Sequence, residues 1–259
     1  MTVTGLLKKL VPAPLYPSAV IRRSVVRQTG RRIVGGPFAG MQFVDRATWG
    51  AYIPKLIGTY ELELREVVER AISRKPPHII DIGGAEGYYA VGFLRRLPHA
   101  RLVVFEQQEH ARRELSALAR MNGVSDRLSI RGGCDLNALA GALEGVQDSL
   151  IICDVEGYEV ELLDLEKLPA LAGADLLVEV HDSRVAGCRD LLRQRFSNTH
   201  RVTAIAQRRR EMSDYPLEHP LAKLWPQAIV KYGLNEFRSP KNSWLYLERR
   251  GSDEPGARA

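Results

Sequence analysis

The sequence lacks the features that mark secreted, cysteine-ligated or membrane-spanning proteins. Its three cysteines, Cys134, Cys153 and Cys188, are an odd number and contain no CxxC pair, which argues against a disulfide framework and a cysteine-rich zinc site. No uninterrupted apolar run approaches the roughly 20 residues that a bilayer-spanning helix requires. The opening stretch MTVTGLLKKLVPAPLYP places its lysines after a short apolar patch and then adds prolines, which makes a poor signal peptide. We therefore expect a reduced, cytoplasmic protein without a transmembrane segment.

An excess of charge of one sign is also nearly absent. The 259 residues carry a formal net charge of only +6, which is too mild to require an anionic partner. Basic residues nevertheless gather between positions 22 and 32 and again at 208–210. A solvated basic face explains both clusters most simply, and binding to nucleic acid or to an acidic membrane surface is the alternative. We therefore disfavour nucleic acid as a partner and keep it as an open alternative.

The sequence does contain a regular alternation of strand-like and helix-like segments. Apolar runs such as HIIDI, LVVF, LIIC and LLVEV are typical of strands buried on both faces, and helical patterns follow most of them. Such alternation predicts a Rossmann-like α/β fold, with a mainly parallel sheet and helices on both faces. Only an irregular insertion separates the last two of seven expected strands, so we expect these two to form an antiparallel pair at the sheet edge. Strands are expected at 78–83, 101–106, 127–134, 149–157, 174–182, 200–207 and 243–250. The segments after the fourth and fifth of these strands predict helices over 158–168 and 184–196.

The same pattern suggests three parts of the chain. Residues 1–58 do not follow the alternation and include the loop-like or hairpin-like piece VGGPFAGMQFVD, so we interpret them as an N-terminal extension. Such an extension could cover a pocket or join two copies of the chain as a homodimer. Residues 59–250 form the α/β domain, with an insertion at about 208–242. Residues 251–259 read as a disordered tail.

The loop after the first expected strand predicts the ligand. It lacks the GxGxxG pattern of dinucleotide-binding folds, because Ala85 takes one of the glycine positions, and it lacks the Gly-Lys-Ser/Thr of phosphate-binding loops. It carries Glu86 where a phosphate would favour a cation. An adenosine with a cationic or zwitterionic tail, such as S-adenosylmethionine, fits these residues better. We expect the ligand to contact Asp81, Gly83, Gly84, Ala85, Glu86, Gly87 and Tyr88.

Polar residues after the next two strands could hold the adenosine. Glu106 ends the second strand, where a carboxylate can accept both ribose hydroxyl groups, and Gln107 follows it. Alternatively, Glu106 caps the next helix. Cys134 and Asp135 end the third strand, and Asp135 is both a candidate acceptor for the adenine amino group and an obvious helix N-cap.

These segments together resemble a known family. IIDIGGAEGYYAVG, VVFE, LARMNGVSDRL, IICDVEGYE and LLVEVHD are similar to class I S-adenosylmethionine-dependent methyltransferases, and DVEGYE followed by VEVHD favours the FkbM-type family. The resemblance covers about residues 76–196. It implies methylation of hydroxyl groups on small molecules or sugars, with S-adenosylhomocysteine as the product.

Candidate catalytic residues follow the fourth and fifth strands. Asp154, Glu156, His181 and Asp182 lie where the transferred methyl group would be, and Asp154 could also touch the cofactor. A hydroxyl acceptor must lose its proton, so one hypothesis makes His181 or Asp154 the base. The other places a divalent ion, such as Mg²⁺, on Asp154 and Asp182, as in catechol-type methyltransferases. His181 could instead bond the next loop, and Asp182 could cap a helix.

Two rival functions remain. The Asn/Asp-Pro-Pro-Tyr motif of amino-group methyltransferases is absent, as is a Pro-Cys nucleophile, but RNA or protein methylation through the arginine clusters is an alternative. A catalytically inactive methyltransferase-like binding module is another, because fold alone does not establish function.

Glu179 is a carboxylate within the apolar strand segment LLVEV. Because burial of an unpaired charge is costly, we expect it to have a structural partner, such as an arginine.

Overall fold

The computed structural model describes residues 16–45, 47–48, 51–217, 227–239 and 242–250. The chain divides into two compact units. The larger unit contains the described residues between 63 and 208 and between 238 and 250, and the smaller unit contains those between 16 and 62 and between 209 and 237. No helix among the described residues is long and apolar enough to cross a membrane.

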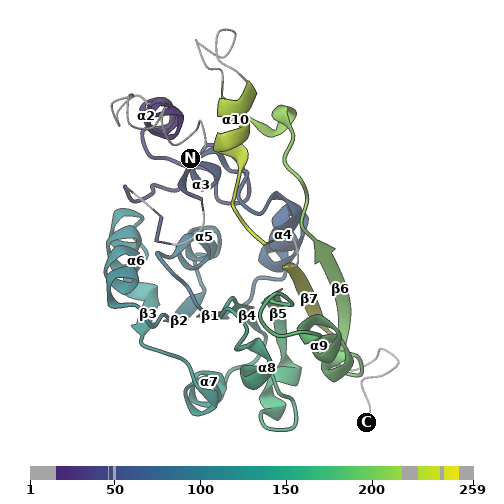
Figure 1. The fold of residues 1–259 in the computed structure, drawn as a ribbon. Coiled ribbons are helices and arrows are strands. Elements are labelled where there is room, and N and C mark those ends of the chain that lie inside the picture. Colours follow the sequence, from purple (N-terminus) through teal and green to yellow (C-terminus); the bar gives the residue numbers. More distant parts are fainter. Residues whose placement is uncertain (1–15, 46, 49–50, 218–226, 240–241, 251–259) are drawn as a thin grey trace. The chain divides into compact units, whose positions relative to one another are not determined.

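The larger unit is built on a seven-stranded sheet with the order β3-β2-β1-β4-β5-β7-β6 (Figure 1). All neighbouring pairs from β3 to β5 are parallel, whereas β7 is antiparallel to both β5 and β6. The sequence-based prediction of a Rossmann-like α/β fold, with a mainly parallel sheet and an antiparallel last pair, is confirmed. The strands are β1 (His78–Ile82), β2 (Arg101–Phe105), β3 (Leu128–Arg131), β4 (Ser149–Cys153), β5 (Ala174–Val180), β6 (His200–Ala206) and β7 (Ser243–Arg249).

Helices cover both faces of this sheet (Figure 1). One face carries α4 (Arg65–Ser73), α5 (Tyr88–Arg96) and α6 (Glu109–Met121), and the other carries α7 (Leu136–Leu143), α8 (Glu159–Leu162) and α9 (Cys188–Phe196). Short 3-10 turns connect some elements, at η2 (Leu62–Leu64), η3 (Ser125–Arg127) and η4 (Pro169–Gly173).

The central strands are buried along their whole length. Every residue of β4 and β5 is buried, as their unbroken apolar runs predict, because helices cover both faces of a parallel sheet. Each fully buried leucine or isoleucine stabilises the fold by about 1.5–3 kcal/mol relative to an exposed one. The core therefore holds the carboxyl ends of β1, β4 and β5 rigidly beside one another.

Two predicted helices differ in length from the observed ones. The helix expected over 158–168 ends at Leu162, because the Asp164 carboxylate accepts the N–H of Glu166 at 3.0 Å and turns the chain. The helix expected over 184–196 begins only at Cys188, after Gly187 adopts a left-handed φ of 78°. Both predictions were wrong about the loops that follow the site strands.

The smaller unit joins the predicted extension to the predicted insertion. It contains α2 (Pro17–Thr29), α3 (Tyr52–Ile57), η5 (Met212–Asp214) and α10 (Gln227–Leu234). Helix α10 was not predicted, and the Arg32–Gln42 bridge gives part of the extension a hairpin-like turn. The Arg210 guanidinium lies 2.5 Å from the Glu236 carboxylate. The predicted tail at 251–259 lies outside the described residues, and the roles of lid and dimer contact stay predictions.

The first arginine cluster makes contacts within its own unit. Arg22 donates to the Asp45 carbonyl and lies over the Tyr52 ring. Arg31 pairs with the Asp45 carboxylate at 2.7 Å, and Arg32 donates to the Gly40 carbonyl at 2.7 Å. These arginines therefore have structural partners, which weakens the case for a nucleic-acid surface.

Candidate active site

The loop after β1 packs directly against the loop after β4. Gly83 has a φ of 88°, and a Cβ built on it would lie only 1.9 Å from the Asp154 carbonyl oxygen. A Cβ on Gly84 would lie 2.5 Å from Val104. The Gly83 N–H donates to the Phe105 carbonyl at 2.8 Å, and the Asp154 N–H donates to the Ile82 carbonyl at 2.9 Å. These glycines therefore let the ends of β1, β2 and β4 close together, which no larger residue would allow.

Asp81 places a carboxylate beneath this loop. Its side chain is buried, and its Oδ2 atom has no hydrogen-bond partner among the described residues. Burial and then the charge of Glu106 raise the pKa of Asp81 to about 7, although a backbone hydrogen bond from Ala90 opposes the shift. Asp81 therefore titrates near neutral pH and leaves an acceptor atom unused at the predicted cofactor site.

Glu106 joins the loops after β1 and β2. Its carboxylate accepts the Ala85 N–H at 2.9 Å and the Gln108 N–H at 2.7 Å. Helix α6 begins without a side-chain cap, so the alternative that Glu106 caps this helix was wrong. Each carboxylate oxygen can accept more than one hydrogen bond. The predicted ribose contact is therefore compatible with these bonds and stays a prediction.

The other predicted cofactor residues surround these loops. Glu86 and Tyr88 are buried, and the Tyr88 ring meets the Tyr89 ring edge-on at 5.3 Å. Asp135 caps α7, because its carboxylate accepts the Ala138 N–H at 2.7 Å. Burial and the charge of Asp135 raise the pKa of the Cys134 thiol to about 12, so it is neutral at physiological pH. Gln107 approaches the loop after β3, where a Cβ on Gly133 would lie 3.3 Å from its Cγ atom.

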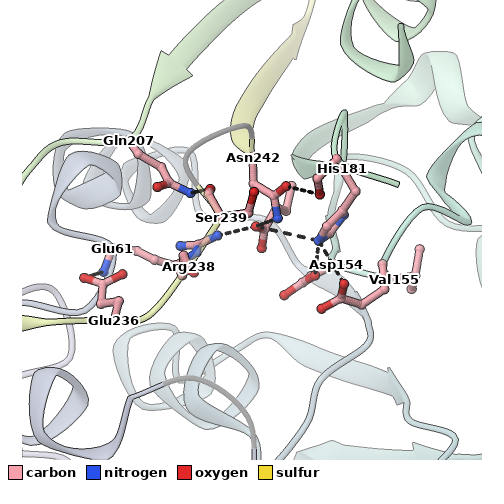
Figure 2. Close-up of polar contacts among 12 residues, drawn as sticks. Glu61, Asp154, Val155, His181, Gln207, Glu236, Arg238, Ser239 and Asn242 are labelled. Carbon is pink, nitrogen blue, oxygen red and sulfur yellow. Dashed lines mark hydrogen bonds and ion pairs between the residues drawn. The ribbon is translucent and has the colours of Figure 1, made fainter. Parts of the chain in front are cut away.

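His181 is the centre of a cluster of carboxylates at the ends of β4 and β5 (Figure 2). Its Nε2 atom lies 3.6 Å from Asp154, 3.8 Å from Glu156 and 3.7 Å from Glu179. The imidazole is only 1% exposed, whereas the side chains of Asp154 and Glu156 are 36% and 66% exposed. Solvent therefore reaches this cluster from the side of Asp154 and Glu156.

Glu159 holds the other side of the His181 ring. This carboxylate is fully buried and lies 2.6 Å from Nδ1 of His181. It also accepts the Val155 N–H at 3.2 Å, within the loop that carries Asp154 and Glu156. Burial alone would lower the pKa of His181, but the hydrogen bond to Glu159 and the neighbouring carboxylate charges outweigh it and raise that pKa above its ordinary value.

The backbone around Glu156 is strained. Glu156 has a φ of 54° and Gly157 a φ of 109°, and non-glycine residues adopt this region at a cost of about 1–3 kcal/mol. The loop after β1 contains a similar case, because Ala85 has a φ of 48°. Both loops at the candidate site are therefore held in conformations that their surroundings must enforce.

Glu179 and Asp182 have partners that explain their positions. The Glu179 carboxylate lies 2.5 Å from the Arg238 guanidinium and accepts from the Asn242 amide at 3.1 Å. The predicted arginine partner of Glu179 is therefore present. The Asp182 carboxylate accepts the Arg189 N–H at 3.3 Å, near the start of α9. This is its expected capping contact, and its pairing with Asp154 around a metal stays a prediction.

The sequence did not indicate three contacts of this site. The sequence around Glu159 predicts only a favourable charge at a helix N-terminus, whereas its bond to His181 spans 22 residues. Arg238 and Asn242 precede β7 and contact Glu179 of the neighbouring strand β5. The buried charge of Glu179 was the signal for a cation, but no local pattern identified which arginine supplies it.

The chain resembles several solved methyltransferase structures at low identity. The O-methyltransferase TomG from Streptomyces achromogenes, in complex with S-adenosylmethionine, is 17% identical with a TM-score of 0.46, and the match covers 58% of this chain and 74% of that one. An O-methyltransferase from Bacillus cereus, in complex with S-adenosylhomocysteine, is 16% identical with a TM-score of 0.42, covering 60% and 89%. A precorrin-6y C5,15-methyltransferase from Geobacter metallireducens is 14% identical with a TM-score of 0.39, covering 54% and 74%. No family model and no curated protein sequence matches the chain.

Proposed function

We propose that this protein is an S-adenosylmethionine-dependent methyltransferase that methylates a hydroxyl group of a small molecule or sugar. One observation carries the proposal. The glycine loop after β1 touches the backbone of Asp154, which also belongs to the carboxylate and histidine cluster. A ligand on the glycine loop and an acceptor at the cluster would therefore be neighbours, as transfer between them requires.

The cofactor half of the site favours a cation over a phosphate. Asp81, Glu86 and Glu106 are buried around the glycine loop, and the stretch from Asp81 to Leu94 contains no lysine or arginine. A dinucleotide or nucleotide phosphate would meet these carboxylates unfavourably. The sulfonium and amino groups of S-adenosylmethionine would complement them, and its carboxylate could accept from N–H groups at the start of α5.

The acceptor half of the site suits removal of a hydroxyl proton. Asp154 and Glu156 are reachable from solvent, and Glu159 fixes His181 behind them. Carboxylates and an imidazole are the usual groups that accept a proton from a hydroxyl during transfer. An amine acceptor would need no such cluster once it is neutral.

Calorimetric titration with S-adenosylmethionine and S-adenosylhomocysteine tests the cofactor assignment. We expect saturable binding by the wild-type protein and at least tenfold weaker binding by Glu106→Gln, which loses one charge and one acceptor at the ribose position. Glu109→Gln is the matched control, because the same change three residues later lies on the exposed start of α6. Folded wild-type protein that binds neither ligand would refute the proposal.

Product formation then separates an enzyme from a binding module. S-adenosylhomocysteine release is measured with a panel of sugars and hydroxylated small molecules, with RNA as a further candidate acceptor. Release with a hydroxyl compound supports the proposal, whereas release with RNA alone would replace it. Tight cofactor binding without turnover on any acceptor would favour the inactive module.

A further inference from the structure

Three side chains at the candidate active site are arranged as ligands of one ion. His181, Asp154 and Glu156 each offer one atom, and these atoms all lie within 4.8 Å of one another. The Nε2 atom of His181 is 3.6 Å from Asp154 and 3.8 Å from Glu156. These distances exceed those of hydrogen bonds, but two atoms bound to one ion at about 2.1 Å each lie roughly 3–4 Å apart.

Glu159 orients the His181 ring so that Nε2 can act as a ligand. Its buried carboxylate engages Nδ1 at 2.6 Å, which fixes the ring and turns Nε2 toward Asp154 and Glu156. A metal-binding histidine almost always donates its other N–H to a carboxylate or carbonyl in this way.

The Nε2 atom of His181 faces three carboxylates from inside the protein. The imidazole is 1% exposed, and its Nε2 atom lies 3.6–3.8 Å from oxygens of Asp154, Glu156 and Glu179, which is longer than a hydrogen bond. A cation between this nitrogen and the carboxylates would contact all of these groups at once.

The charges agree with a cation. Four carboxylates surround this imidazole, those of Asp154, Glu156, Glu159 and Glu179. Among the arginines paired with them, Arg238 contacts Glu179 and Arg184 contacts Glu156 at 3.6 Å. Even with a protonated imidazole, these groups keep a net negative charge.

We propose that Asp154, Glu156 and His181 bind a divalent first-row transition metal, such as Mn²⁺ or Zn²⁺. An imidazole nitrogen beside two carboxylates suits these ions, whereas Mg²⁺ prefers oxygen ligands alone. The site differs from the Asp154–Asp182 pair expected from the sequence. Its catalytic role rests on the proposed function, because such an ion would lower the pKa of an acceptor hydroxyl. Binding of the ion itself does not depend on that function.

Titration of the full-length, chelator-treated protein with Co²⁺ tests the site, without S-adenosylmethionine present. We expect one equivalent to bind with the visible spectrum of a bound nitrogen and oxygen ligand set, and Mn²⁺ and Zn²⁺ to displace it. Glu156→Gln should weaken Co²⁺ binding at least tenfold, and it should leave the fold intact because the Glu156 side chain is exposed. Glu161→Gln is the matched control, because Glu161 is an exposed glutamate of α8 outside the cluster.

Several outcomes would overturn the site. These are absence of a bound Co²⁺ spectrum in folded protein, equal weakening by Glu156→Gln and Glu161→Gln, and equally effective displacement by Mg²⁺. Cofactor binding is measured separately, so loss of that binding with an intact Co²⁺ site would refute the proposed function alone. An intact cofactor site without Co²⁺ binding would refute this inference alone.

Discussion

Replacing Gly83 by alanine should damage the fold by a predictable amount. The added Cβ would lie 1.9 Å from the Asp154 carbonyl oxygen, and the residue would keep a φ of 88°. The left-handed conformation costs an alanine about 1–2 kcal/mol, and forcing a methyl group into packed surroundings adds about 1–3 kcal/mol. We therefore expect Gly83→Ala to lower the free energy of unfolding by roughly 2–5 kcal/mol.

Gly123→Ala separates the two causes. Gly123 also has a positive φ, of 67°, but a Cβ there would meet nothing within 4 Å. It should therefore lose only the conformational part, about 1–2 kcal/mol. Urea unfolding followed by far-ultraviolet circular dichroism measures both variants. If the two variants lose the same free energy of unfolding to within about 0.5 kcal/mol, the close contact between the β1 and β4 loops does not explain why position 83 needs glycine.

Three further predictions concern charge and helix propensity. Burial and the charge of Glu106 raise the pKa of Asp81 from its ordinary 3.8 to about 7 in the folded protein. The stability that this side chain contributes is therefore full below about pH 4 and is lost as the pH rises to about 7. The free energy of unfolding of Asp81→Asn, measured with denaturant, should therefore rise relative to that of the wild type between about pH 4 and pH 7, by up to about 4 kcal/mol. A difference that does not change with pH would contradict this. Arg238→Met should lower the free energy of unfolding by about 3–5 kcal/mol, because it leaves the Glu179 charge buried without its partner. Adding Glu179→Met should recover much of this loss, and a double variant whose effects simply add would argue against the pairing. Gly141→Ala in α7 meets no atom within 4 Å and should raise stability by about 0.5–1 kcal/mol in thermal melts, so a lower melting temperature would show an unseen constraint.

The predictions that succeeded rest on local patterns. The unbroken apolar runs of β4 and β5 required burial on both faces, and the alternation with helical segments required parallel neighbours. In both cases, residues within one short stretch carry the physical requirement. The expected contact of the glycines after β1 with a ligand stays a prediction, and the close approach of Gly83 to the Asp154 backbone was not predicted.

The predictions that failed concern irregular segments. Helix α8 ends early at the turn that Asp164 stabilises, and helix α9 begins late, after Gly187. In both cases the apolar spacing of the sequence continues beyond the observed helix. Helix α10 lies within the predicted insertion, whose polar residues and prolines favoured an irregular segment over a helix. Its contacts with α2 and α3 belong to the same unit, and packing of this kind often decides whether a short helix forms.

The sequence by itself determined the sheet, its order along the chain and the edge at which the candidate residues gather, because periodicity and burial are local properties. Only the tertiary structure decided which charges meet there. Glu159 reaches His181 across 22 residues, and Arg238 reaches Glu179 from the segment before β7, the antiparallel neighbour of β5. The partner of a buried charge depends on which side chains the fold brings close to it, and spacing along the chain does not reveal this. The Asp154, Glu156 and His181 cluster therefore became visible as a candidate metal site only once the strands were assembled.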